Sequence, residues 1–111
     1  MKTDFFMELD SAVTVCDRDG IILYMNDKSC KSFEKYGGME LIGKSLFDCH
    51  NENSCKIIRQ LIKEDKSNTY TVTGNGIKKL IHQAPWYKNG RVMGLIEFST
   101  ELPEEMPDHQ R

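Results

Sequence analysis

Residues 12–25 read Ala-Val-Thr-Val-Cys-Asp-Arg-Asp-Gly-Ile-Ile-Leu-Tyr-Met, two apolar runs on either side of an Asp-Gly pair. This arrangement is typical of a β-hairpin, because Gly readily adopts the positive φ angle that a tight turn requires. Asn75-Gly76 and Asn89-Gly90 repeat the pattern between later apolar runs. The three turns predict five strands, at 12–16, 21–25, 69–73, 79–87 and 92–98.

Helical signals lie between the second and the third strand. Asn26 or Asp27 can cap a helix over about 28–36, and the pair Gly37-Gly38 ends it. A single helical turn follows at 39–42.

A second full helix begins at a cap, Asn53 or Ser54, and extends through about Glu64. Its apolar residues recur at positions i, i+3, i+6 and i+7, which is the spacing of one buried helical face. They are Cys55, Ile58, Leu61 and Ile62. We expect this face to pack on the sheet.

The element order, two strands, then helices, then three strands, predicts an α+β fold. One five-stranded antiparallel sheet carries the helices on one face. A chain of 111 residues has room for a single hydrophobic core. We assign this core to residues 12–101, with an amphipathic N-terminal lead at 1–11 and a flexible C-terminal tail at 102–111. Pro103 and Pro107 favour such a tail, because Pro lacks the N–H that a helix interior needs.

The composition excludes several classes of partner. The net charge is −2, from 15 basic and 17 acidic side chains scattered along the chain, so nucleic acid is not expected as a direct partner. No apolar run approaches the ~18 residues of a membrane span. The first residues are too acidic for a signal peptide, and we therefore expect a cytoplasmic location.

No catalytic or metal-binding constellation is evident in the sequence. The three histidines have no neighbouring Ser or Cys paired with an Asp, and residues 73–76 lack the Lys of a phosphate loop. The four cysteines, Cys16, Cys30, Cys49 and Cys55, form no C-x-x-C pair, which favours reduced thiols over a structural zinc site. We expect neither enzymatic activity nor a bound metal.

Three segments, in this order and spacing, resemble the PAS family of sensory domains. Residues 15–26 are similar to the opening hairpin of that family, 40–46 to its E-L-I-G-K central helix and following loop, and 84–101 to its last hairpin. The resemblance covers 12–101. It implies a sensory or regulatory module of bacterial-type signal transduction, in which the 54–64 helix lies across a concave sheet.

Two segments depart from the family pattern. Phe98-Ser99-Thr100 stands where the family has a closing D-I-T motif, so the Asp that often links the sheet to an output helix is missing. The flavin-binding, light-sensing branch carries a Cys in a run like G-R-N-C. Here residues 43–46 read Gly-Lys-Ser-Leu, and Cys49 comes three residues later. A covalent photoactive flavin is therefore not expected.

The resemblance also implies a space between helix and sheet, filled by side chains or by a small ligand. Alternate strand residues are expected to point into it, as in the flavin-binding branch. The candidate pocket residues are Thr14, Cys16, Leu46, His50, Ile58, Leu61, Ile62, Ile81, Gln83, Ile96 and Phe98. The alternative is a closed core in which Gln83 is hydrogen-bonded.

The other face of the sheet is a candidate dimer interface. Period-2 alternation places His82 and Trp86 on one face. The resemblance to the flavin-binding branch implies that this is the outer face, where PAS-like domains commonly pack a leading helix or a second subunit. The candidate interface residues are Phe5, Phe6, Leu9, Leu80, His82, Trp86 and Leu95. Either the chain's own lead covers this face, or a second copy or a signalling partner protein does, since Trp is a favoured interface anchor.

His50 has two interpretations. Haem-binding members of the family take an axial imidazole from the neighbouring helix, which makes His50 a candidate haem ligand. Alternatively, its ring contacts backbone groups of its own loop. The sequence identifies no other cofactor.

The leading hypothesis is a sensory or regulatory module that binds a small ligand, a protein partner, or both. The first alternative is a ligand-free dimerisation module, and the second is a haem-based gas or redox sensor that uses His50. Oxidation of Cys16 or Cys49 is a further alternative. About ten residues follow the last strand, so we expect any kinase, cyclase or DNA-binding output in a partner or elsewhere in a longer protein.

Overall fold

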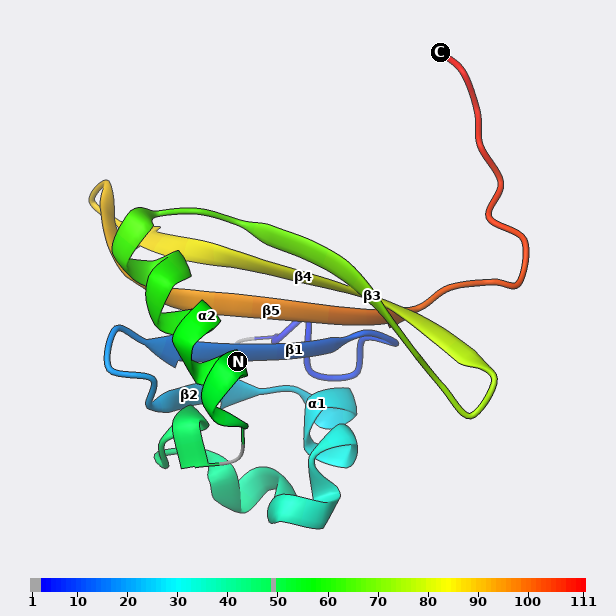
Figure 1. The fold of residues 1–111 in the computed structure, drawn as a ribbon. Coiled ribbons are helices and arrows are strands. Elements are labelled where there is room, and N and C mark those ends of the chain that lie inside the picture. The colour runs from blue at the N-terminus through cyan, green and yellow to red at the C-terminus, as the bar shows by residue number, and fades with distance from the viewer. Residues whose placement is uncertain (1–2, 49) are drawn as a thin grey trace.

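The computed structural model of the chain describes residues 3–48 and 50–111. Five strands form one antiparallel sheet in the order β2-β1-β5-β4-β3 (Figure 1). They are β1 (Ala12–Asp17), β2 (Ile22–Met25), β3 (Asn68–Gly74), β4 (Ile77–Lys88) and β5 (Arg91–Glu101). The predicted α+β class and all five predicted strands are confirmed, and β4 and β5 extend further than expected.

Two of the three predicted turns have the expected backbone. Asn75 and Asn89 both have φ 53°, and the Gly that follows each also has a positive φ, which suits a two-residue hairpin. The turn between β1 and β2 differs, because Asp19 is not among the described residues with positive φ. There the carboxylate of Asp17 accepts from the backbone N–H groups of Asp19 and Ile21, both at 2.9 Å, and closes a longer turn.

The helices begin and end at slightly different residues from those predicted. Helix α1 (Asp27–Ser32) has the predicted Asn26 cap but stops before Tyr36, because the chain tightens at Phe33 into a 3₁₀ turn at Glu34–Tyr36. Helix α2 (Glu52–Glu64) begins earlier than expected. Its cap is Asn51, whose side chain accepts from the Ser54 backbone N–H at 2.8 Å, so the predicted Asn53 or Ser54 cap is wrong. The predicted single turn is a 3₁₀ helix at Gly38–Leu41.

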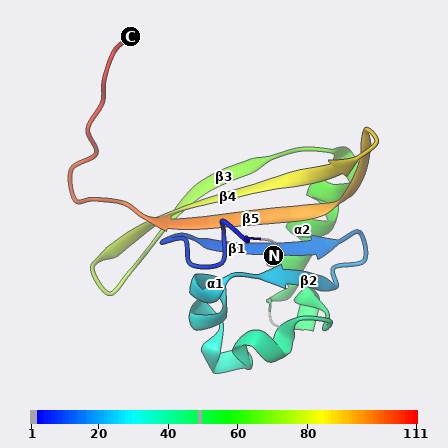
Figure 2. The same ribbon diagram turned by 180° about the vertical axis from the view of Figure 1, so that it is seen from behind.

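Helix α2 lies across one face of the sheet, which we call the helix face (Figure 1). Its buried residues Ile58, Leu61 and Ile62 join one core cluster with Cys16 of β1 and Leu95 of β5. The opposite, outer face carries no helix of the described chain (Figure 2). The expected packing of the α2 apolar face on the sheet is therefore confirmed.

The register of the sheet decides which side chains share a face. Residues directly opposite each other in an antiparallel ladder point to the same side. Cys16 is opposite Leu95, and both are buried in the core, so Leu95 lies on the helix face and not on the outer face as predicted. By the same alternation Ile96 and Phe98 lie on the outer face, opposite Ala84 and His82. The side chains of β5 alternate between the two faces as predicted. The assignment was wrong by one position, so the residues expected on the helix face lie on the outer face and the reverse.

Gly94 and Trp86 hold β5 close to β1. A Cβ atom at Gly94 would lie 1.9 Å from the carbonyl oxygen of Cys16, so no larger residue fits there. The indole Nε1 of Trp86, which lies opposite Gly94, donates to the same Cys16 oxygen at 2.8 Å. Trp86 therefore has a packing and hydrogen-bonding role within the domain.

The N-terminal lead is attached near the start of α1 and passes over the outer face beside β1 (Figure 2). The Met7 carbonyl accepts from the Asp27 N–H at 2.9 Å, and the Tyr24 hydroxyl donates to the carboxylate of Asp4 at 2.6 Å. The side chains of Phe5 and Phe6 are nevertheless 82% and 51% exposed. The lead thus contributes its backbone to the fold and leaves its aromatic side chains in solvent.

The chain after β5 has no regular secondary structure and runs away from the sheet (Figure 1). Its first residue, Leu102, still donates its backbone N–H to the carbonyl of Lys78 at 2.8 Å. None of the helices in the described residues has the length and apolar character needed to cross a membrane.

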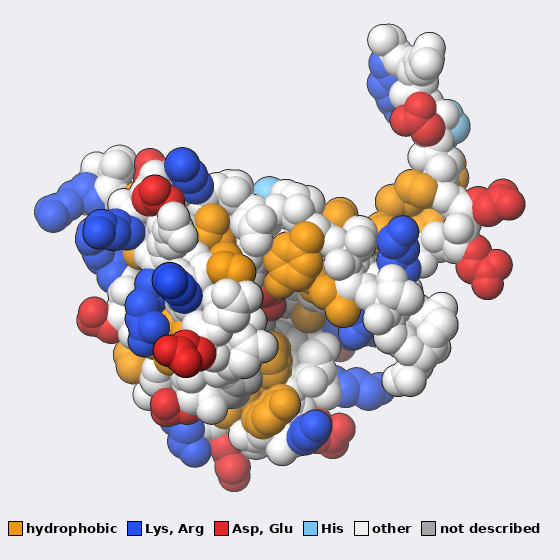
Figure 3. All heavy atoms as spheres, in the orientation of Figure 1, with side chains coloured by type: hydrophobic (Ala, Val, Ile, Leu, Met, Phe, Trp, Pro, Cys, Tyr) orange, Lys and Arg blue, Asp and Glu red, His pale blue; other side chains and the backbone are white. Residues whose placement is uncertain are grey.

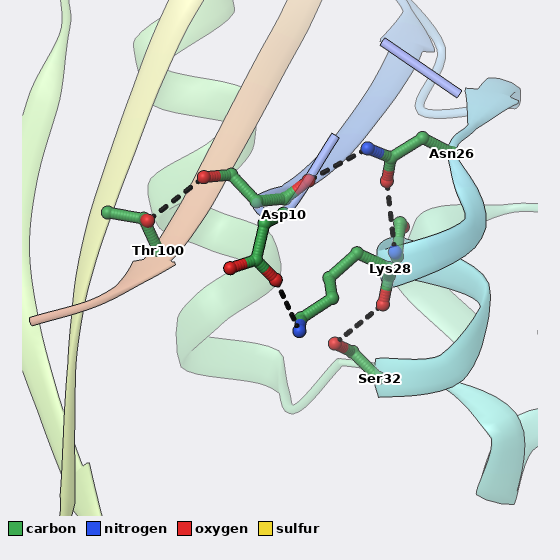
Figure 4. Close-up of polar contacts among 7 residues, drawn as sticks. Asp10, Asn26, Lys28, Ser32 and Thr100 are labelled. Atoms are coloured by element: carbon green, nitrogen blue, oxygen red, sulfur yellow. Dashed lines mark hydrogen bonds and ion pairs between the residues drawn. The ribbon is translucent and has the colours of Figure 1, made fainter. Parts of the chain in front are cut away.

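The side-chain amide of Asn26 connects the lead, β1 and α1. Figure 4 shows this side chain at the start of α1. Its oxygen accepts from the backbone N–H groups of Val13 and Ser29 at 2.9 and 3.0 Å. Its nitrogen donates to the carbonyls of Phe6 and Ser11, both at 2.8 Å. Asn26 is 0% exposed, so water cannot replace these four bonds without entering the core.

Two further contacts lie close to Asn26 (Figure 4). One is an ion pair at the surface, and the other joins the end of the lead to β5. The Lys28 ammonium lies 2.9 Å from the carboxylate of Asp10, and the Ser11 hydroxyl donates to Thr100 at 2.9 Å. The Asp10 side chain is 96% exposed, so this ion pair contributes little to stability.

Replacing Asn26 with Ala should destabilise the fold by about 3 kcal/mol or more, because buried donors and acceptors lose their partners at roughly 1–3 kcal/mol each. The matched control is Asn51→Ala, which removes one exposed helix cap and should cost only about 1 kcal/mol. Urea unfolding followed by circular dichroism measures both. Equal losses for the two variants would contradict the structural role given to Asn26.

Candidate functional site

An open groove of about 300 Å³ lies between the first half of α2 and the helix face of β3, β4 and β5. Figure 3 shows the hollowed surface beside α2, with apolar side chains at its rim. The residues that line the groove are His50, Ser54, Ile57, Ile58, Asn68, Tyr70, Gln83 and Glu97. This volume is at the lower end of the range for ligand pockets, roughly 300–1,000 Å³.

The groove narrows to an inner end of about 20 Å³ that reaches toward β1 and is bordered by Thr14, Cys16 and Leu46. A space of roughly that size holds about one water molecule. The hydroxyl of Thr14 is 2.5 Å from the hydroxyl of Ser29, so the polar atoms at this end are paired within the protein. Side chains thus fill the interior, and the ligand-sized space lies outside it.

Helical spacing and sheet register together bring the lining residues to one place. Ser54, Ile57 and Ile58 follow the i, i+3, i+4 spacing that places side chains on neighbouring parts of one helical face. Across from them, Gln83 is opposite Asn68 on one side and opposite Glu97 on the other. Directly opposite residues in adjacent strands point the same way, so these three polar side chains form one row.

The row is a directional chain of hydrogen bonds. The amide of Asn68 donates to Oε1 of Gln83 at 3.2 Å, and Nε2 of Gln83 donates to Oε1 of Glu97 at 2.9 Å. Gln83 is 5% exposed, and both its amide oxygen and its amide nitrogen are hydrogen-bonded. The chain of donors ends at the Glu97 carboxylate, which is half-buried at the groove.

The structure brings some of the predicted pocket residues together and separates others. Thr14, Cys16, Leu46, His50, Ile58 and Gln83 border the groove or its inner end. Leu61, Ile62 and Ile81 are buried on the helix face but do not border it. Ile96 and Phe98 point to the outer face.

Sequence reasoning missed five lining residues: Ser54, Ile57, Asn68, Tyr70 and Glu97. Of these five residues, Glu97 is the one that the sequence indicates most clearly as a site residue. It is an acidic residue inside the otherwise uncharged run 92–98, where a charge on a half-buried strand needs a structural or functional reason.

His50 makes a contact with its own loop. Its Nδ1 lies 2.9 Å from the carbonyl oxygen of Leu46, and its ring centroid is 6.1 Å from that of Phe33. This geometry agrees with the loop-contact interpretation. Cys49, named as a candidate redox residue, lies outside the described residues.

The groove does not fit a haem. A porphyrin needs a deep, enclosed, apolar slot, whereas the enclosed part here measures about 20 Å³. The larger part, about 300 Å³, is open and presents the polar row that ends at Glu97. We therefore derive no role for His50 through haem iron.

The predicted interface residues fall into three groups. Phe5, Phe6 and Leu9 are exposed, while Leu80, His82 and Trp86 are half-buried on the outer face. Leu95 is buried in the core and is therefore not an interface residue, contrary to the prediction. The His82 ring contacts the hydroxyl of Thr69 at 2.7 Å across the β3–β4 ladder.

The comparison with known families agrees with this geometry. The sequence model of a family described as the PAS fold matches residues 6–105. The chain belongs to the PAS family. No sequence among curated proteins matches it.

Solved PAS structures share the fold at low sequence identity. The PAS domain of the histidine kinase ThkA is 15% identical with a TM-score of 0.67, over 83% of this chain and 99% of that one. The Aer2 receptor from Vibrio cholerae, described as a dual PAS-haem oxygen sensor, is 13% identical with a TM-score of 0.62, over 84% and 95%. VqmA from the same organism, solved bound to DPO, is 18% identical with a TM-score of 0.69, over 89% of this chain and 55% of VqmA.

The Cys16 thiol at the inner end should be unreactive in the native state. Burial raises its pKa, and the nearby carboxylates of Asp17 and Glu97 raise it further, so little thiolate is present at neutral pH. We expect iodoacetamide to label native Cys16 at least about tenfold more slowly than the urea-unfolded chain, whose thiol pKa is about 8.5. Mass-spectrometric peptide mapping measures the two rates. Equal rates would restore Cys16 as a candidate oxidation sensor.

Proposed function

We propose that this PAS domain is a sensory module that binds a small ligand in the groove between α2 and the β3–β4–β5 half of the sheet. The observation that supports this most directly is the polar row from Asn68 to Glu97 in an opening that also presents the apolar side chains of Ile57 and Ile58. Ligand sites commonly combine an apolar lining with a few convergent polar groups of this kind.

The volume and position of the groove limit how a ligand could act. A ligand there would touch α2 and three strands at once, so its binding energy would depend on how α2 sits on the sheet. It can shift the balance between two arrangements only by binding one of them more tightly. The proposed signal is therefore a change in the position of α2 relative to β3–β5, read by a partner or by an output segment.

The proposed role is non-catalytic. The described residues contain no group of three or more His, Cys, Asp or Glu that could hold a metal ion. Two of the similar structures, VqmA bound to DPO and Aer2, described as a PAS-haem sensor, support ligand binding as a use of this fold.

Filling the groove tests the proposal. We expect proton–nitrogen correlation NMR to show that a mixture of small fragments shifts resonances of groove residues such as Tyr70 and Gln83. Ser54→Trp should abolish these shifts, because the indole would occupy the opening. Asn53→Trp, on the exposed side of the same helical turn, is the matched control and should preserve them. Shifts that survive Ser54→Trp, or no groove shifts with any fragment, would contradict a ligand site here.

A second candidate function is dimerisation through the outer face. Phe98 is 36% exposed at the centre of that face, and the lead adds Phe5 at 82% and Leu9 at 40%. Exposed aromatic side chains grouped on one face are typical of protein–protein interfaces. This candidate and the ligand groove occupy opposite faces, so the two functions are compatible.

For this second candidate, sedimentation velocity should show a dimer of the parent chain and a monomer of Phe98→Glu. Phe98 is a cleaner test residue than Trp86, because replacing Trp86 also breaks its hydrogen bond to Cys16. Val72→Glu is the control, since Val72 is 48% exposed but lies on the helix-face side of β3. A parent chain that stays monomeric at all concentrations would refute the interface.

A further inference from the structure

The orientation of the Gln83 amide makes Glu97 the acceptor end of the groove. A carboxylate only accepts hydrogen bonds, so the part of Gln83 that meets Glu97 must be its NH₂ group. The Gln83 carbonyl then faces Asn68, which donates to it. The row therefore ends in a carboxylate acceptor at Glu97, although each amide keeps a second N–H that neither of these two bonds uses.

No Lys or Arg side chain pairs with Glu97 in the described chain, and the titratable side chain that shares the groove lining with Glu97 is His50. None of the residues that line the groove or its inner end is Lys or Arg. The one ion pair among residues 3–48 and 50–111 joins Lys28 to Asp10. Nε2 of Gln83 is the side-chain donor that contacts Oε1 of Glu97, and Oε2 has no donor within the described residues. Because the groove is open, water can solvate this carboxylate in the empty protein, and a ligand group that is positive or rich in N–H groups could take the place of that water.

The surroundings of Glu97 supply a second feature that favours a cation. The ring of Tyr70 lines the same opening and is 41% exposed, and the face of an aromatic ring attracts a positive charge. Burial, and secondly the charge of Glu97, raise the pKa of the Tyr70 hydroxyl, so the ring stays neutral. Ile57 and Ile58 provide an apolar wall on the helix side.

We propose that the groove selects a small organic cation, an ammonium or another protonated nitrogen attached to a short apolar body. The positive nitrogen would pair with Glu97 beneath Tyr70, and the apolar body would lie against Ile57 and Ile58. This inference rests on the proposed function, because it names the ligand class for the same groove. It is also a stronger claim than the proposed function. A groove that bound neutral ligands as tightly as cations would satisfy the proposed function but not the selection of a cation.

Three probes that share one ring separate charge from shape: benzylammonium, benzyl alcohol and benzoate. Titrated into the intact chain and followed by groove resonances in correlation NMR, benzylammonium should bind about tenfold more tightly than benzyl alcohol, and benzoate should not bind. Charge-assisted hydrogen bonds are roughly twice as strong as neutral ones, which gives this order its physical basis.

Glu97→Gln tests the residue itself. The new side-chain carbonyl can still accept from Nε2 of Gln83, so the polar row survives while the charge is lost. The variant should lose about tenfold in affinity for benzylammonium and keep its affinity for benzyl alcohol. Glu101→Gln removes the same charge from the exposed end of the same strand and should change neither affinity.

The outcomes distinguish the two proposals. If the alcohol and the acid bind as tightly as the amine, or if the preference for the amine survives Glu97→Gln, the cation selection is overturned and the ligand groove stands. If fragments of other kinds shift the groove resonances but benzylammonium does not, the cation selection is likewise overturned. If no compound of any charge shifts them, the proposed function fails together with this inference.

Discussion

The buried amide of Asn26 is the contact on which the arrangement of the rest depends. Its four hydrogen bonds join the start of β1, the first turn of α1 and two carbonyls of the lead, and the side chain is 0% exposed. An amide supplies two donors and two acceptor positions, and here the donors bond to two carbonyls of the lead while the oxygen accepts from one N–H of β1 and one of α1. Because β1 is the second strand of the sheet, the position of β1 relative to α1 also sets where β5 and the groove lie.

The two faces of the sheet differ in what they bury and what they expose. The helix face buries Cys16, Leu95 and the apolar side of α2, and its interior is filled to the size of a single water at the inner end of the groove. The polar row lies at the edge of this core. The Asn68 amide donates to the Gln83 amide, which donates to the Glu97 carboxylate, and this carboxylate is in contact with solvent. The outer face keeps apolar side chains half-exposed, and the lead crosses it with its backbone bonded and its aromatic rings in solvent.

Family membership constrains the fold more than the chemistry of the site. The three similar structures described above are 13–18% identical to this chain, so the likeness to them is one of backbone fold. The groove here lacks the enclosed slot that a haem needs, yet Aer2, with the same fold, is described as a haem sensor. What this domain binds must therefore be argued from its own Gln83, Glu97 and Tyr70.

Local signals in the sequence determined which segments form helices and hairpins. Tertiary contacts decided which residues of each strand face the core and which strands lie side by side. Asn-Gly pairs, the Asn26 cap and the apolar face of α2 act over a few residues, so hairpins, helix α1 and the buried side of α2 could be predicted. Alternation along β5 was also visible, but a register shift between Trp86 and Tyr87 exchanges the two faces of β5 relative to β4, which puts Leu95 inside and Phe98 outside. The polar row has both origins: the two-residue turn at Asn75-Gly76 already sets Asn68 opposite Gln83, whereas the register shift in the β4–β5 ladder decides that Glu97 is the residue opposite Gln83.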